Sequence, residues 1–124
     1  MSKKTKTPAP TFMFLFRTPA GMPDPTPEEM QKTFQKWMKW INSMQTKGQY
    51  LSGEPLEDVP ARVLRGPRGA QGIDAPFAGG KEVIGGYMLI AAKNLAAASR
   101  IAKGCPGYAN GGSVEIRRIM PMPM

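Results

Sequence analysis

The sequence predicts an α+β domain in which two helices cover one face of a mainly antiparallel sheet. Apolar residues alternate in the manner of a strand over residues 11–17 and 83–92, and they recur with helical spacing over residues 27–47. Glycine, proline and asparagine mark turns between such segments. In chain order the segments read strand, helix, strand, hairpin, strand, helix, strand.

The first strand is expected over residues 11–17. The residues before it, 1–10, are rich in Lys, Thr and Pro and are predicted to form a disordered tail. Three phenylalanines alternate along the strand with Met13 and Leu15, so both of its faces are apolar. A strand that is apolar on both faces is expected to be covered on both faces.

The first helix is expected from Pro27 to about Lys47. Thr26 is its predicted N-cap, Glu29 closes a capping box, and Gly48 provides a left-handed C-terminal cap. Its apolar stripe is more typical of core packing than of a ligand-binding box. The stripe comprises Met30, Phe34, Trp37, Met38, Ile41 and Met44.

A short strand is expected over residues 49–53. Farther on, residues 61–65 and 70–73 flank the turn sequence Gly-Pro-Arg-Gly at 66–69, which predicts a β-hairpin. The hairpin leads to Asp74, which we expect to hold a sharp turn through its side chain.

The stretch after Asp74 is predicted to continue as a turn and then as a central strand. Pro76 keeps the residue before it extended, and Phe77 is the expected apolar contact beneath the turn. In the strand over residues 83–92, alternation places Ile84 on the same side as Met88 and Ile90, and neither side is polar. This strand is therefore also expected to be covered on both faces.

The C-terminal part predicts a second helix and a last strand. Asn94 is the expected N-cap, and the Gly-Cys-Pro-Gly sequence at 104–107 ends the helix. The last strand is expected over residues 113–119, followed by an extended tail at 121–124. The thin apolar stripe of the helix comprises Leu95, Ala98, Ile101 and Ala102.

This order corresponds to a ferredoxin-like βαββαβ plan with an inserted hairpin, in one domain over residues 11–120. Both helices would cover one face of the sheet and leave the other apolar face exposed in a monomer. Because a large exposed apolar patch marks an interface, we infer a homodimer that packs sheet on sheet.

Composition narrows the function classes. The chain of 124 residues has no His and one Cys, which excludes a Ser-His-Asp triad and a zinc motif, so neither metal nor cofactor is expected. The net charge is +8, but the basic residues are scattered, so nucleic-acid binding is not favoured. No apolar run approaches a membrane span or a signal segment, so a cytoplasmic protein is expected.

Several spaced motifs resemble the YCII-related family, also called the DGPF-domain family. The resemblance implies a dimeric α+β barrel of ferredoxin-like subunits. The family's activity is largely unassigned: enzymatic roles are suspected from an acid in a cleft, joined in some branches by a histidine, and some members look like companions of sigma factors. The motifs are Asp74-Ala75-Pro76-Phe77-Ala78, Lys81-Glu82, Gly85-Gly86-Tyr87, Cys105-Pro106-Gly107 and the segment 111–117.

The sequence departs from the family pattern at three positions. Ala75 replaces the glycine of the DGPF motif, Gly79 stands where an acid is often found, and Asn110 replaces a common histidine. The acid Asp74 is retained without that histidine, which argues against His-Asp acid/base chemistry in this chain.

Asp74 is the candidate catalytic residue, either as a general base or as a group that holds a cationic or hydroxyl-bearing ligand. The alternative is that it only caps the turn. Lys81 and Glu82 either flank the same pocket or form a solvated pair. Tyr87 follows Gly85 and Gly86, which leave a hollow for a ligand or, preferably, for close packing.

Two arginines of the hairpin, Arg62 and Arg65, are weaker candidates for ligand binding. Cys105 is expected to be a buried filler. Three functions follow: a metal-free small-molecule enzyme, a small-molecule-binding or regulatory dimer, and, with least support, a nucleic-acid binder.

Overall fold

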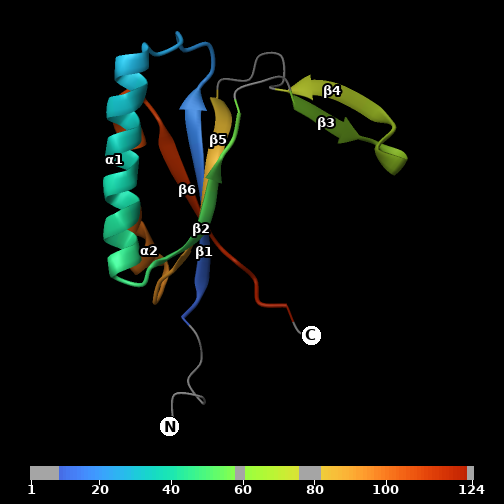
Figure 1. Ribbon diagram of the computed structural model, residues 1–124. Helices are drawn as coiled ribbons and strands as arrows, with labels where there is room; N and C mark the ends of the chain where they lie inside the picture. The colour runs from blue at the N-terminus through green and yellow to red at the C-terminus, as the bar shows by residue number, and fades with distance from the viewer. Residues whose placement is uncertain (1–8, 58–60, 76–81, 123–124) are drawn as a thin grey trace.

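Two helices lie against a four-stranded antiparallel sheet, and a separate β-hairpin stands beside it (Figure 1). The computed structural model describes residues 9–57, 61–75 and 82–122, with the side chains of these residues except 73–75. The predicted contact at Phe77 therefore lies outside the described residues. The elements are β1 (Thr11–Pro19), α1 (Pro27–Thr46), β2 (Tyr50–Pro55), β3 (Ala61–Arg65), β4 (Gln71–Ala75), β5 (Glu82–Ala91), α2 (Leu95–Ala102) and β6 (Ser113–Arg118), with short 3-10 helices η2 (Pro67–Gly69) and η3 (Pro106–Asn110).

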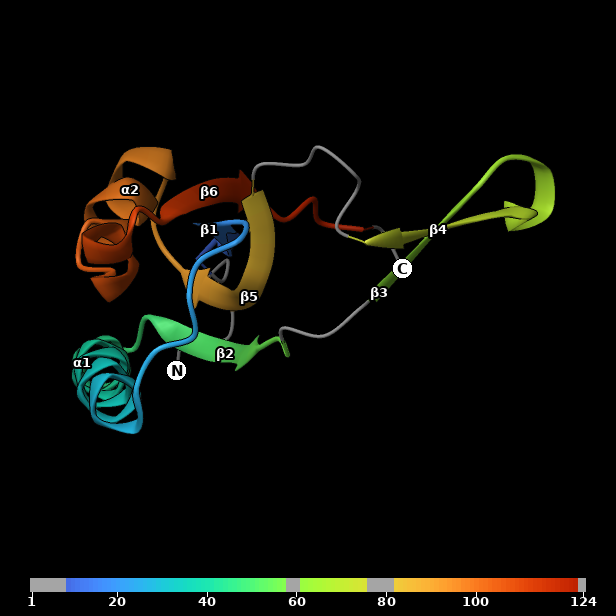
Figure 2. The same cartoon turned by 90° about the horizontal axis from the view of Figure 1, so that it is seen from above.

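The strand order of the sheet is β2-β5-β1-β6, and each neighbouring pair is antiparallel. Both helices lie on the same side of this sheet, α1 beside β2 and α2 beside β6 (Figure 2). The predicted α+β class, with two helices and a mostly antiparallel sheet, is confirmed. The hairpin forms its own two-stranded sheet from β3 and β4, also as predicted.

The ends of both helices follow the local signals of the sequence. The Thr26 side chain accepts a hydrogen bond from the backbone N–H of Glu29, and the Glu29 carboxylate accepts one from the N–H of Thr26. Gly48 adopts a φ of +71° just after α1, which is a conformation that favours glycine. Asn94 caps α2 by accepting a hydrogen bond from the N–H of Ala97.

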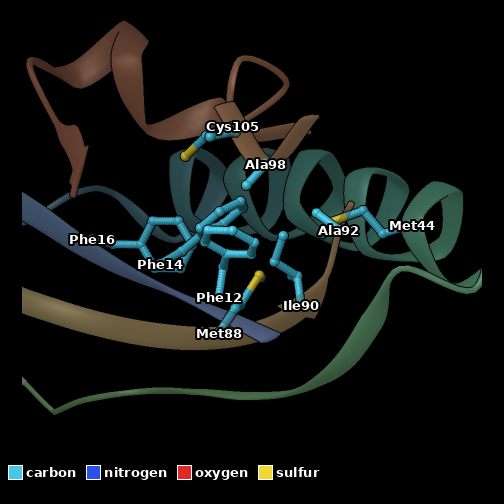
Figure 3. Packing of buried hydrophobic residues seen from close by; sticks show 10 residues of the cluster. Phe12, Phe14, Phe16, Met44, Met88, Ile90, Ala92, Ala98 and Cys105 are labelled. Atoms are coloured by element: carbon cyan, nitrogen blue, oxygen red, sulfur yellow. The ribbon is translucent and has the colours of Figure 1, made fainter. Parts of the chain in front are cut away.

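The core lies between the helices and the sheet (Figure 3). The phenylalanines of β1 are buried beneath the helices, and the ring of Phe14 stacks on that of Trp40 at 6.3 Å with an interplanar angle of 8°. Phe16 meets Trp37 edge to face at 5.0 Å. The buried set is Phe12, Phe14, Phe16, Met44, Met88, Ile90, Ala92, Ala98, Ala102 and Cys105.

The predicted core stripe of α1 is wrong at three positions. Met30, Phe34 and Met38 are exposed, and Trp40 packs on the core instead. Residues spaced by four advance about 40° around a helix at each step, because one turn takes about 3.6 residues. Phe34 and Met38 are therefore turned away from the face that carries Trp40, whereas Met30 lies in the first turn of α1. In α2, Leu95 is likewise exposed, at the first helical residue.

A bulge in β5 changes the predicted alternation. Phe16 pairs with Gly86, whereas the next residue, Arg17, pairs with Ile84, so Gly85 is the extra residue. Because paired residues share a face, Ile84 lies on the side away from the helices. The prediction that it shares a side with Met88 is wrong, and its exposure agrees with the register.

The position expected for Asp74 is also corrected. Its backbone lies within β4, directly opposite Arg62 of β3, and not at a turn that follows the hairpin. The hairpin continues as far as Ala75, which pairs with Ala61. Extended backbone before Pro76 agrees with the restriction that a proline places on the preceding residue.

Candidate functional site

The sheet surface away from the helices, called the open face here, combines an apolar centre with polar edges. The strand registers set two rows of side chains across it. One row runs Glu54, Tyr87, Leu15, Glu115, and the next runs Ser52, Leu89, Met13, Arg117. The four central side chains of these rows are half-buried in the single chain. Ile84 adds to this surface at the level of Arg17.

Tyr87 lies beside an acidic residue at the β2 side of the open face. It pairs directly with Glu54 of β2. Burial, then the nearby Glu54 carboxylate, and then Tyr87 raise the pKa of the Tyr50 phenol. Tyr50 itself pairs with Ile90 and packs against the core on the helix side, so the open face carries one phenol and one carboxylate here. A carboxylate accepts hydrogen bonds or attracts a cation, and a phenol donates and accepts, so the pair of Tyr87 and Glu54 suits a cationic or hydroxyl-bearing molecule.

The opposite edge of the open face carries an ion-pair cluster. Arg17 of β1 donates from Nη2 and Nε to one carboxylate oxygen of Glu115, at 2.9 and 3.3 Å. Arg117 donates to the other oxygen at 3.2 Å. The hydrogen bond from Arg17, and then that from Arg117, hold the pKa of Glu115 below its ordinary value.

This cluster was missed by the sequence analysis. Alternation along residues 113–117 puts Glu115 and Arg117 on the same side of the last strand, but nothing in the sequence joins that side to the end of the first strand. The available signal was the position of Arg17, which follows Phe16 and must point away from the phenylalanine face.

Replacing Arg17 by glutamine is expected to raise the pKa of Glu115 toward its ordinary value, and by more than Arg117→Gln does, because the hydrogen bond from Arg17 is the larger cause. In the folded wild type the pKa is lowered. The ion pairs therefore stabilise the fold at a pH above the ordinary pKa of glutamate, and this contribution is lost as the pH falls through the lowered value. NMR titration of the Glu115 carboxyl measures its pKa in the wild type and in both variants. The same pKa in all three proteins would contradict the ion pairs described here.

Of the other predicted site residues, one lies in the four-stranded sheet and two lie in the hairpin. Glu82 begins β5, opposite Pro19 and five residues before Tyr87. Arg62 lies opposite Asp74 in the hairpin, and Arg65 opposite Gln71. Lys81 lies outside the described residues, as do the details of the Asp74 side chain.

The two glycines before Tyr87 differ in their surroundings. A side chain at Gly86 would lie 2.9 Å from the carbonyl oxygen of Glu54, so this glycine permits the close approach of β2 and β5. At Gly85 no atom lies within 4 Å of a Cβ position. Close packing therefore explains Gly86, and space remains at Gly85.

Cys105 is a buried residue at the end of α2, as predicted. Burial raises the pKa of its thiol, against a smaller lowering effect of the hydrogen bond that its Sγ accepts from the N–H of Gly107 at 3.3 Å. Such a thiol is poorly ionised and is not an activated nucleophile.

Within residues 9–57, 61–75 and 82–122, no group of three or more His, Cys, Asp or Glu side chains is placed to hold a metal ion. In the same part of the chain, no helix is long and apolar enough to cross a membrane.

The fold and these motifs agree with a comparison to known families. The family model of the YCII-related domain matches residues 12–123, which is nearly the whole chain. The protein therefore belongs to the YCII-related family, as the sequence motifs indicated. A search of curated proteins gives no match to this chain.

Proposed function

We propose that the chain is a ferredoxin-like subunit of a homodimer, a dimeric α+β barrel, which binds a small cationic or hydroxyl-bearing molecule beside Tyr87. The observation that carries the proposal is the row Glu54, Tyr87, Leu15, Glu115 on the open face. It joins an apolar centre, suited to a second subunit, to a polar cluster suited to a ligand.

The dimer is proposed because the centre of the open face is apolar and neither helix covers it. Met13, Leu15 and Leu89 form a half-buried apolar centre on the side without helices, and Ile84 beside them is exposed. Burying such a surface against a second copy removes it from water, with about 25 cal/mol gained per Å² of apolar area. The strand order β2-β5-β1-β6 supports the ferredoxin-like assignment.

The ligand site is proposed at the β2 side of this interface, where Glu54 and Tyr87 pair. Asp74 is the proposed acid from the hairpin, opposite Arg62. In an enzymatic version, Asp74 is the general base of a proton transfer that uses no metal. Lys81, Glu82 and Arg65 remain proposed ligand-binding residues.

Wild-type protein is expected to gain melting temperature with a subset of small amines and polyols in a thermal-shift panel, because a ligand bound only by the folded state stabilises it. Tyr87→Phe and Asp74→Asn are each expected to abolish that gain and to retain a near-native melting temperature without ligand. A shift that persists in both variants would contradict the proposed site.

The matched control is Asp24→Asn, an exposed acid of the loop before α1. This variant is expected to keep the ligand-dependent shift. If Asp74 serves only as a cross-strand partner in the hairpin, Asp74→Asn lowers stability by about 0.2–1 kcal/mol and ligand binding does not change.

A further inference from the structure

A cavity of about 670 Å³, open to solvent, is lined by residues of both helices. The helices lie on the side of the sheet opposite the open face (Figure 2). Each helix contributes a pair of residues spaced by four to its walls: Trp40 and Met44 from α1, and Ala97 and Ile101 from α2. Ala92, directly after β5, lines it as well. This size is within the range of about 300–1,000 Å³ typical of small-molecule pockets.

Three cations surround this inter-helix cavity. Lys47 follows α1, Lys93 lies between β5 and α2, and Arg100 belongs to α2. The cavity lining includes no acidic residue. Across the part of the chain that the structure describes, none of the three is paired with a carboxylate. Three unneutralised positive charges around one space attract an anion.

The wall also offers a hydrogen-bond donor at a fixed position. Trp40 is held by its parallel stack on Phe14 and by an edge-to-face contact with Trp37 at 5.6 Å. Its Nε1 edge is directed toward Gly104, where a Cβ would lie only 2.7 Å from Nε1. The side-chain hydrogen bonds of the described residues leave this N–H without an acceptor.

We propose that this cavity binds a small organic anion whose charged group is held by the three cations and whose apolar body lies against the aromatic and aliphatic walls. An acyl or aromatic acid has this chemistry. A bare inorganic anion lacks the apolar body, and a neutral alcohol lacks the charge. The site is separate from the proposed site beside Tyr87, because the two lie on opposite faces of the sheet.

Fluorescence of Trp40 can report directly on this cavity. The chain has two tryptophans, so Trp37→Phe leaves Trp40 as the single reporter. We expect octanoate to change its emission with saturation. We expect 1-octanol and inorganic phosphate, which each lack one half of the required chemistry, to bind at least about tenfold more weakly.

In the same Trp37→Phe background, the double variant Lys93→Gln and Arg100→Gln is expected to weaken octanoate binding by about tenfold or more and to leave 1-octanol binding unchanged. The control Lys36→Gln removes an exposed charge of α1 outside the lining and should bind octanoate normally. Ala97→Leu, which fills part of the cavity, should weaken both octanoate and 1-octanol.

An absence of saturable change with octanoate overturns the proposal, and so does equal octanoate affinity in the double variant and its control. Circular dichroism of each variant establishes that it is folded before binding is measured. These results are independent of the dimer, since Leu89→Glu on the open face should leave octanoate binding intact.

Discussion

Replacing Phe14 by alanine is expected to lower the free energy of unfolding by about 3–5 kcal/mol, the usual loss for a fully buried aromatic residue. The Phe14 side chain is 0 % exposed. It stacks on Trp40 and meets Phe16 edge to face at 6.3 Å, so its removal leaves a cavity between β1 and α1. Urea denaturation followed by circular dichroism measures the change.

The matched control is Phe34→Ala in α1. Phe34 is 63 % exposed, although the helical spacing of the sequence predicted it to be in the core. Its replacement is expected to change stability by no more than about 0.5 kcal/mol, as for most surface substitutions. Equal losses at the two positions would contradict the orientation of α1.

Replacing Gly86 by alanine is expected to destabilise the protein by about 1–3 kcal/mol, as overpacking does in a well-packed core. A Cβ at this position would lie 2.9 Å from the carbonyl oxygen of Glu54 and 3.2 Å from the Cα of Pro55. Both are backbone atoms of β2, so relief requires β2 and β5 to separate. Thermal or urea unfolding measures the loss.

Gly85→Ala provides the comparison, one residue earlier in the same strand. No atom lies within 4 Å of the added methyl group, and φ at Gly85 is not positive. The substitution is therefore expected to be neutral or slightly stabilising, since alanine restricts the unfolded chain more than glycine does. A larger loss of stability for Gly85→Ala than for Gly86→Ala would contradict the position of the bulge at Gly85.

Features encoded by neighbouring residues were predictable from the sequence. The capping box of Thr26 and Glu29, the cap at Asn94 and the turn at 66–69 each depend on contacts within a few residues. These signals fix where elements begin and end. They also led to the correct element order and, through the spaced motifs, to the family.

Features that depend on distant parts of the chain were not predictable. The contact of Arg17 with Glu115 joins residues 98 positions apart and follows from the registers of β1 with β6. The bulge at Gly85 likewise depends on pairing with β1. Alternation showed that β1 has two apolar faces but could not decide which of them meets the helices. The inter-helix cavity depends on how α1 and α2 are spaced over the sheet.

The central claim, a homodimer that packs through its open face, is tested most directly by the mass of the protein in solution. Light scattering after size-exclusion chromatography at low micromolar concentration is expected to give twice the mass of one chain. Leu89→Glu, which places a charge in the apolar centre of the open face, is expected to give a folded monomer. Leu95→Glu, at an exposed residue of α2 on the other side of the sheet, should remain a dimer. A monomeric wild type, or a Leu89→Glu variant that stays dimeric, would contradict this account.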